Sequence, residues 1–105
     1  MIRVKIKYLD QNISQIEIKG HSENEDGYND LVCAGVSCIV YGTLNALEEL
    51  TLNNYLVKQD DGYTLMEISE SNEVNQIILK TMVIQLATIV EKYPMYIKIK
   101  QEVKS

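Results

Sequence analysis

One histidine and one cysteine are spaced in a way that suits nucleophilic catalysis. His21, the only histidine, follows a strand-like segment, and Cys33 lies near the start of a segment with helical periodicity. A catalytic thiol needs a partner that takes its proton and later protonates the leaving amine, and histidine does both near neutral pH. The eleven residues between them are enough chain to bring the two side chains together. The spacing is therefore compatible with a cysteine nucleophile and its proton carrier.

The expected helix start would favour the reactive thiolate of Cys33. Asn29 or Asp30 is a suitable cap, and with Asp30 as the cap Cys33 is the third helical residue. Unpaired N–H groups and the helix dipole favour an anion there, and the same groups suit the oxyanion of a tetrahedral intermediate. The negative charge of Asp30 opposes this effect unless its carboxylate binds the Cys33 N–H. Ser37 lies one turn further along the same helix face.

The same residues also have a purely structural interpretation. Cysteine is among the most buried residue types, so an inert Cys33 in an apolar helix is the commoner case, and Cys38 is assigned that role. A loop histidine such as His21 usually has no special function, and Ser37 can simply bond back to a main-chain carbonyl. The residues alone leave both interpretations open.

Metal and disulfide chemistry are not expected. Two cysteines and one histidine supply at most three ligands, whereas a structural zinc site usually needs four. Cys33 and Cys38 are five residues apart, which is about 140° around a helix, so their side chains diverge. We therefore expect no metal, no cofactor and no redox pair.

Charge and hydropathy restrict the partners. Ten basic and 15 acidic residues give a net charge of −5, and the basic residues form only two short runs, at 3–7 and 98–104, so nucleic-acid binding is not expected. The longest unbroken apolar run, 38–41, has four residues, against about twenty for a membrane span. The N-terminus also lacks the apolar stretch of a signal peptide. We expect a cytoplasmic protein with no membrane segment.

Hydrophobic periodicity predicts an α+β fold. Alternation predicts strands at 2–8, 15–20, 55–59, 63–69 and 97–100, and three-four spacing predicts helices at 31–50 and 74–93. This ββαββαβ order is most simply a two-layer sandwich with both helices on one face of a mainly antiparallel sheet. The length of 105 residues suits a single domain over 1–105.

Turn signals complete this outline. Asp61 and Gly62 form a strong two-residue hairpin signal, and Pro94 ends the second helix. Residues 22–29 are polar and aperiodic, which predicts a mobile loop with Gly27 as a hinge. We expect this loop to order over an extended peptide, with Gly27 and Tyr28 in contact with it.

A dense motif joins these candidate residues. It contains Gly-His-Ser at 20–22, a glycine at 27 and Asp-Leu-Val-Cys-Ala-Gly-Val-Ser at 30–37. It resembles the signature of the ribosomal-processing cysteine protease family, Prp, which is Gly-His-Ala, a glycine and Asp-Ile-Val-Cys-Ala-Ala-Val-Ser. The similarity covers the whole chain in length, element order and the Tyr-Pro-Met-Tyr-Ile passage at 93–97. The departures, which remove no reacting group, are Ser22, Leu31, Gly35 and Cys38.

The resemblance implies a cysteine endopeptidase whose catalytic dyad is His21 and Cys33, with Gly20, Asp30 and Ser37 in supporting positions. It implies removal of a short N-terminal extension from a large-subunit ribosomal protein through a thioester intermediate, and a homodimer. Two other classes use the same residues differently. One is a non-catalytic ribosome-associated peptide-binding module, and the other is an acyl-transfer or thiol-redox enzyme.

Overall fold

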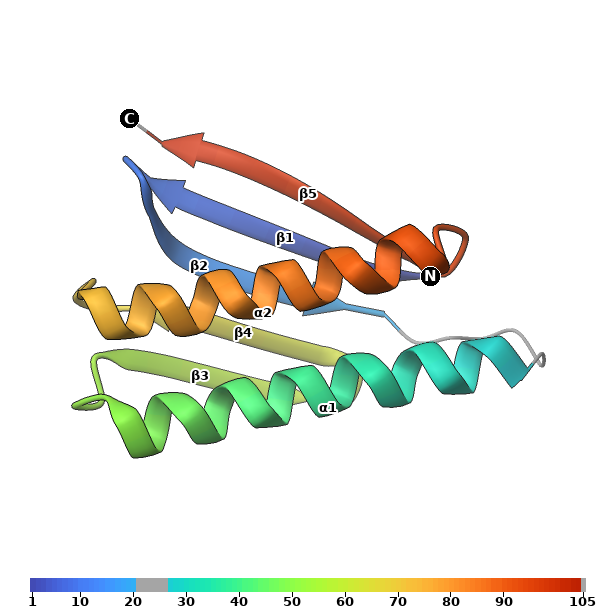
Figure 1. Ribbon diagram of the computed structural model, residues 1–105, viewed down its shortest axis with the longest axis horizontal. Helices are drawn as coiled ribbons and strands as arrows, with labels where there is room; N and C mark the ends of the chain where they lie inside the picture. The colour runs from blue at the N-terminus through green and yellow to red at the C-terminus, as the bar shows by residue number, and fades with distance from the viewer. Residues whose placement is uncertain (21–26, 105) are drawn as a thin grey trace.

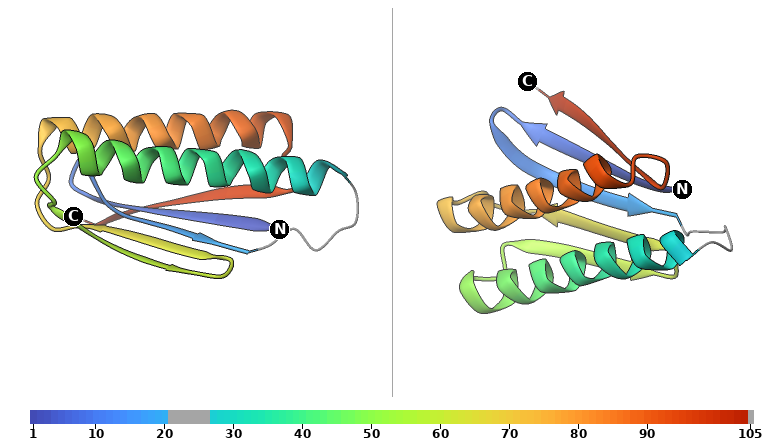
Figure 2. Two further views of the ribbon diagram at one scale, coloured as in Figure 1. Left: turned by 90° about the horizontal axis from the view of Figure 1, so that it is seen from below. Right: turned by 45° about the vertical axis from the view of Figure 1, so that its right-hand side comes forward.

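Five strands form one sheet, and two helices cover one of its faces (Figures 1 and 2). The computed structural model describes residues 1–20 and 27–104. The predicted ββαββαβ order and α+β class are confirmed. The elements are β1 (Ile2–Leu9), β2 (Asn12–Lys19), α1 (Gly27–Leu50), β3 (Tyr55–Asp60), β4 (Tyr63–Ile68), α2 (Glu73–Lys92) and β5 (Ile97–Lys104).

The sheet is mainly antiparallel, as predicted. Its strand order is β3-β4-β2-β1-β5, so β3 and β5 are the two edge strands. The pairs β1–β2, β2–β4 and β3–β4 are antiparallel, and β1–β5 is parallel. The pairing of β4 with β2 carries the β3–β4 hairpin to one side of the molecule, where α1 lies over it.

The core fills the space between the sheet and the helices. Alternate residues of β1 and β2 face the helices, and each helix turns one apolar stripe toward the sheet. Side chains with at most 6% exposure form a single cluster. Its helical members are Val32, Val36, Val40, Leu47, Leu79, Met82 and Leu86.

Both helices are apolar along most of their length. Over Asp30–Leu50 and Glu73–Lys92 they are long and apolar enough, by length and composition alone, to cross a membrane. The sequence-based expectation of no membrane segment considered only uninterrupted apolar runs, so it did not detect this property of the two helices. The mean hydropathy of a window stays high even when polar residues are scattered through it. Here each helix lies along the sheet with one stripe in the core, which is how the core helices of a globular domain use such a composition.

A buried glutamine joins α2 to the β1–β2 hairpin. Gln76 is 5% exposed, and its Oε1 accepts a hydrogen bond from the Ile13 N–H at 2.7 Å. Its Nε2 donates to the Ile13 carbonyl at 2.9 Å. Ile13 lies beside the point where the β1–β2 register shifts. One side chain therefore satisfies both main-chain groups of a buried residue 63 positions away in sequence.

We expect Gln76→Leu to lower the free energy of unfolding by about 2–4 kcal/mol, because the N–H and C=O of Ile13 would stay buried without partners. Urea unfolding followed by circular dichroism measures the change. Gln85→Leu is the matched control, since Gln85 is exposed on the same helix and its loss should change stability by no more than about 0.5 kcal/mol. Equal stability of the two variants would contradict the role of Gln76.

Candidate active site

The end of β2 is held in place by Gly20. The φ angle of Gly20 is +113°, which favours glycine, and a Cβ there would overlap the main-chain carbonyl oxygen of Met1. The Gly20 N–H donates to the carbonyl of Gly62, in the β3–β4 turn, at 3.0 Å. The chain therefore leaves the sheet directly beside the hairpin. His21 is the next residue in the sequence, and it lies outside the described residues.

Helix α1 begins at Gly27, earlier than the sequence predicted. The prediction of Asp30 as the cap is wrong, because Asp30 lies within the first helical turn, where it is exposed. The helix dipole favours an acidic residue in that turn as well as at the cap, so the sequence alone does not separate the two positions. Gly27 and Tyr28, predicted to belong to the loop, are helical, and residues 22–26 of that loop lie outside the described residues.

This earlier start moves Cys33 into the second turn of α1. Counted from Gly27, it is the seventh helical residue, so its placement in the first turn is wrong. Its N–H is directed at the carbonyl four residues back and is not one of the unpaired amides of the helix start. Because the dipole effect falls off within the first turn, it favours an anion at Cys33 less than the sequence suggested.

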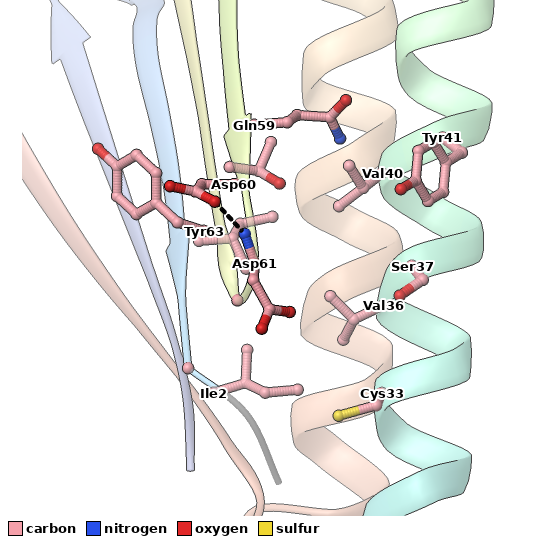
Figure 3. Close-up of a pocket in the computed structure, with 14 residues that line it drawn as sticks. Ile2, Cys33, Val36, Ser37, Val40, Tyr41, Gln59, Asp60, Asp61 and Tyr63 are labelled. Carbon is pink, nitrogen blue, oxygen red and sulfur yellow. Dashed lines mark hydrogen bonds between the residues drawn. The ribbon is translucent and has the colours of Figure 1, made fainter.

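Cys33 lines a pocket between α1 and the β3–β4 hairpin (Figure 3). The side chain is half-buried, and its sulfur points from α1 toward the sheet, on the side of Ile2. The cavity volume is about 390 Å³. One wall is the α1 face with Ser37 and Tyr41, and the other is formed by residues 59–64. The sulfur therefore borders a space that a reactant can enter.

The pocket brings together three of the predicted site residues. Gly20, Cys33 and Ser37 all line it, whereas Asp30 does not. Cys38 lines a different pocket, between α1 and α2, so the prediction that the two side chains diverge is confirmed. Within residues 1–20 and 27–104, no three His, Cys, Asp or Glu side chains are placed to hold a metal ion.

The hairpin wall was not predicted as part of the site. The Tyr63 hydroxyl donates to Glu17 Oε2 at 2.8 Å, and this bond is the main reason that the pKa of Tyr63 is raised above its usual value. Asp60 Oδ1 accepts from the Asp61 N–H at 2.8 Å within the turn (Figure 3). The Asp61-Gly62 signal correctly predicted the turn, but only the pairing of β4 with β2 brings it opposite Cys33.

Comparisons with known proteins identify the class. Residues 1–98 match the family described as cysteine protease Prp. The ribosomal processing cysteine protease Prp of Staphylococcus aureus (strain Mu50 / ATCC 700699) is 32% identical over 97 residues, which cover 89% of this chain and 92% of the relative. That of Bacillus subtilis (strain 168) is 33% identical over 91 residues, which cover 80% and 81%. The protein is a cysteine peptidase.

Solved structures agree with this assignment. Prp from S. aureus in complex with a substrate peptide superposes with a TM-score of 0.90 at 30% identity, covering 97% of this chain and 100% of that chain. The complex with a covalently linked product peptide gives 0.88 at 31%, with the same coverage. The chain belongs to the Prp family of cysteine proteases, so the resemblance in its sequence is confirmed.

We expect Gly20→Ala to lower peptidase activity at least about ten-fold and the free energy of unfolding by about 1–3 kcal/mol. The added Cβ would push against a main-chain carbonyl and displace the chain just before His21. Peptide cleavage and thermal unfolding measure the two effects. Gly42→Ala is the control, because a Cβ at Gly42 meets nothing within 4 Å. A fully active Gly20→Ala variant would show that this backbone position does not matter for the site.

Proposed function

We propose that this peptidase removes a short N-terminal extension from a large-subunit ribosomal protein, with Cys33 as the nucleophile and His21 as the proton carrier. The Cys33 sulfur directed into the pocket is the observation that carries the proposal. Membership of the Prp family and the ribosomal-processing names of its relatives support the substrate class. The family assignment also argues against the non-catalytic module and the acyl-transfer or redox enzyme.

The proposed reaction follows the chemistry of a thiol and an imidazole. His21 takes the thiol proton of Cys33, and the thiolate attacks the scissile carbonyl. The tetrahedral intermediate collapses as His21 protonates the leaving amine, which leaves a thioester on Cys33. Water, deprotonated by His21, then hydrolyses the thioester and restores the thiol. A carbonyl in the pocket between α1 and the hairpin would lie on the side to which the sulfur points.

The oxyanion needs a donor other than the Cys33 N–H, because that group is directed into the helix. Ser37 lies one turn after Cys33 and lines the same pocket, so its hydroxyl is assigned as a donor to the developing charge. The unpaired N–H groups of residues 27–29 are a second source. Asp30 supports the site indirectly, by stabilising the start of α1 through the helix dipole.

The remaining parts of the proposal concern binding and assembly. Gly27 and Tyr28 are assigned to peptide contact because they stand at the start of α1, about one and a half turns before Cys33. A net charge of −5 supports a peptide partner rather than nucleic acid. The resemblance to the family supports a cytoplasmic homodimer with no cofactor and no membrane attachment. Light scattering at micromolar concentration tests the dimer.

We expect Cys33→Ala and His21→Ala each to lower cleavage of the extended ribosomal precursor by at least about 10³-fold, because each removes a reacting group. Intact mass spectrometry of the precursor before and after incubation measures the cleavage and identifies the bond. Cys38→Ala, which alters the cysteine outside the pocket, is the matched control and should stay active. Cleavage at the normal rate by either dyad variant would rule out the dyad.

Alkylation separates a nucleophilic Cys33 from an inert one. Exposure alone favours Cys38, which is exposed, over the half-buried Cys33. An activated thiolate reverses this order, so we expect iodoacetamide at neutral pH to modify Cys33 at least about ten-fold faster than Cys38. The difference should shrink in His21→Ala. Peptide mapping by mass spectrometry measures both rates, and faster labelling of Cys38 in the unmodified protein would indicate an inert Cys33.

A further inference from the structure

The outer edge of β3 lies beside the pocket that contains Cys33. β3 pairs with β4 alone, so no strand within the described residues covers its other side. Gln59 belongs to this edge strand and also lines the pocket, and its side chain extends from β3 toward α1 (Figure 3). An unpaired strand edge is therefore continuous with the space next to the sulfur.

The register identifies the main-chain groups on this edge. The Ser69 N–H donates to the Asn54 carbonyl, and Asp60 faces Tyr63, so the even-numbered positions form the hydrogen-bonded pairs with β4. Antiparallel partners alternate between bonded and non-bonded pairs. The N–H and C=O groups of the intervening residues, Val57 and Gln59 among them, consequently point away from the sheet.

The α1 wall of the pocket is long enough for a short extended peptide. Cys33, Ser37 and Tyr41 follow one another at intervals of four along α1, which is about 12 Å in a helix. An extended chain advances about 3.3 Å per residue, so roughly three or four substrate residues fit along this wall. Val36 and Val40, also on α1, line the pocket and add apolar surface to this wall.

We propose that the peptide substrate binds as an additional strand on the outer edge of β3, with the outward main-chain groups of Val57 and Gln59 as its partners and its scissile bond at Cys33. This inference rests on the proposed role of Cys33. An endopeptidase must hold its substrate extended, and an open strand edge does so through main-chain hydrogen bonds alone. The S. aureus relatives with a bound substrate peptide and a covalently linked product peptide support a peptide as the occupant.

The other edge of the sheet differs in two respects. β5 contains three lysines in eight residues, a composition that protects an edge from pairing, whereas β3 contains one lysine in six. β5 also lies on the far side of the sheet from the hairpin that faces Cys33. We therefore expect the peptide to bind at the edge of β3 and not at the edge of β5, so a substitution on β5 serves as the control.

Proline substitution tests the edge donor directly. Proline is tolerated where an edge N–H points outward, so Gln59→Pro removes that donor and leaves the β3–β4 ladder intact. Gln101→Pro on β5 is the matched control. The Ile2 N–H donates to the Tyr96 carbonyl, and Ile2 pairs with Ile97, so even-numbered residues of β5 bond to β1. The main-chain N–H of Gln101 therefore points outward from the sheet. With a synthetic peptide spanning the ribosomal extension and its cleavage site, we expect Gln59→Pro to raise KM about three- to ten-fold and Gln101→Pro to leave it unchanged. Equal KM values for the two folded variants would overturn the inference.

N-methylation of the substrate gives a second test that does not depend on how a variant folds. A strand on the β3 edge donates from every second residue, so methylating successive amides of the same peptide should weaken binding with a period of two. We expect losses of about three- to ten-fold at alternate positions and little change between them. Losses without this period would reject edge pairing. Cleavage by Cys33→Ala would instead reject the proposed function, so the two failures are distinguishable.

Discussion

The site depends on the conformation of one residue, Gly20, at the end of β2. Its positive φ and its close approach to the Met1 carbonyl exclude any side chain, and its N–H is bonded to the Gly62 carbonyl. The turn is held from the other direction as well, because Tyr63 pairs with Lys19 and hydrogen-bonds to Glu17 on β2. The end of β2 and the hairpin tip therefore form one unit, and this unit is the wall that faces Cys33.

Most of the fold follows from local patterns, because strands and helices here have one buried face and their periods of 2 and 3.6 are visible in the sequence. The positions that escaped prediction depend on other signals. Asp30 is equally suited to a cap and to a first turn, so the sequence did not predict that α1 starts at Gly27. The start of α2 is fixed by a reciprocal pair of asparagines, Asn72 and Asn75, rather than by the more familiar serine and glutamate.

The candidate site was predictable on its α1 side and at Gly20, but not on the side of the hairpin. The angular separation of Cys33 from Cys38 follows from helix geometry, and it correctly places them in different pockets. The opposite wall depends on a strand pairing across more than 40 residues, between β2 and β4, and no local pattern encodes that contact. The bond between Gln76 and Ile13 escaped for the same reason, since a polar residue on a helix gives no sign that its partner is 63 positions away.

The position of Cys33 in the second turn of α1 changes which groups can stabilise negative charge at the site. A thiol in the first turn would gain from the helix dipole and from unpaired amides, whereas Cys33 gains less from the dipole and has its own N–H directed into the helix. In the proposed mechanism, the imidazole of His21 then activates the thiol, and charge stabilisation comes from donors such as Ser37. A nucleophile of this kind benefits from a substrate held rigidly, because alignment reduces the entropic part of the barrier without electrostatic help. The hairpin opposite Cys33 can hold a substrate in this way, because its edge offers main-chain partners and because Gly20 and Tyr63 fix its tip to β2.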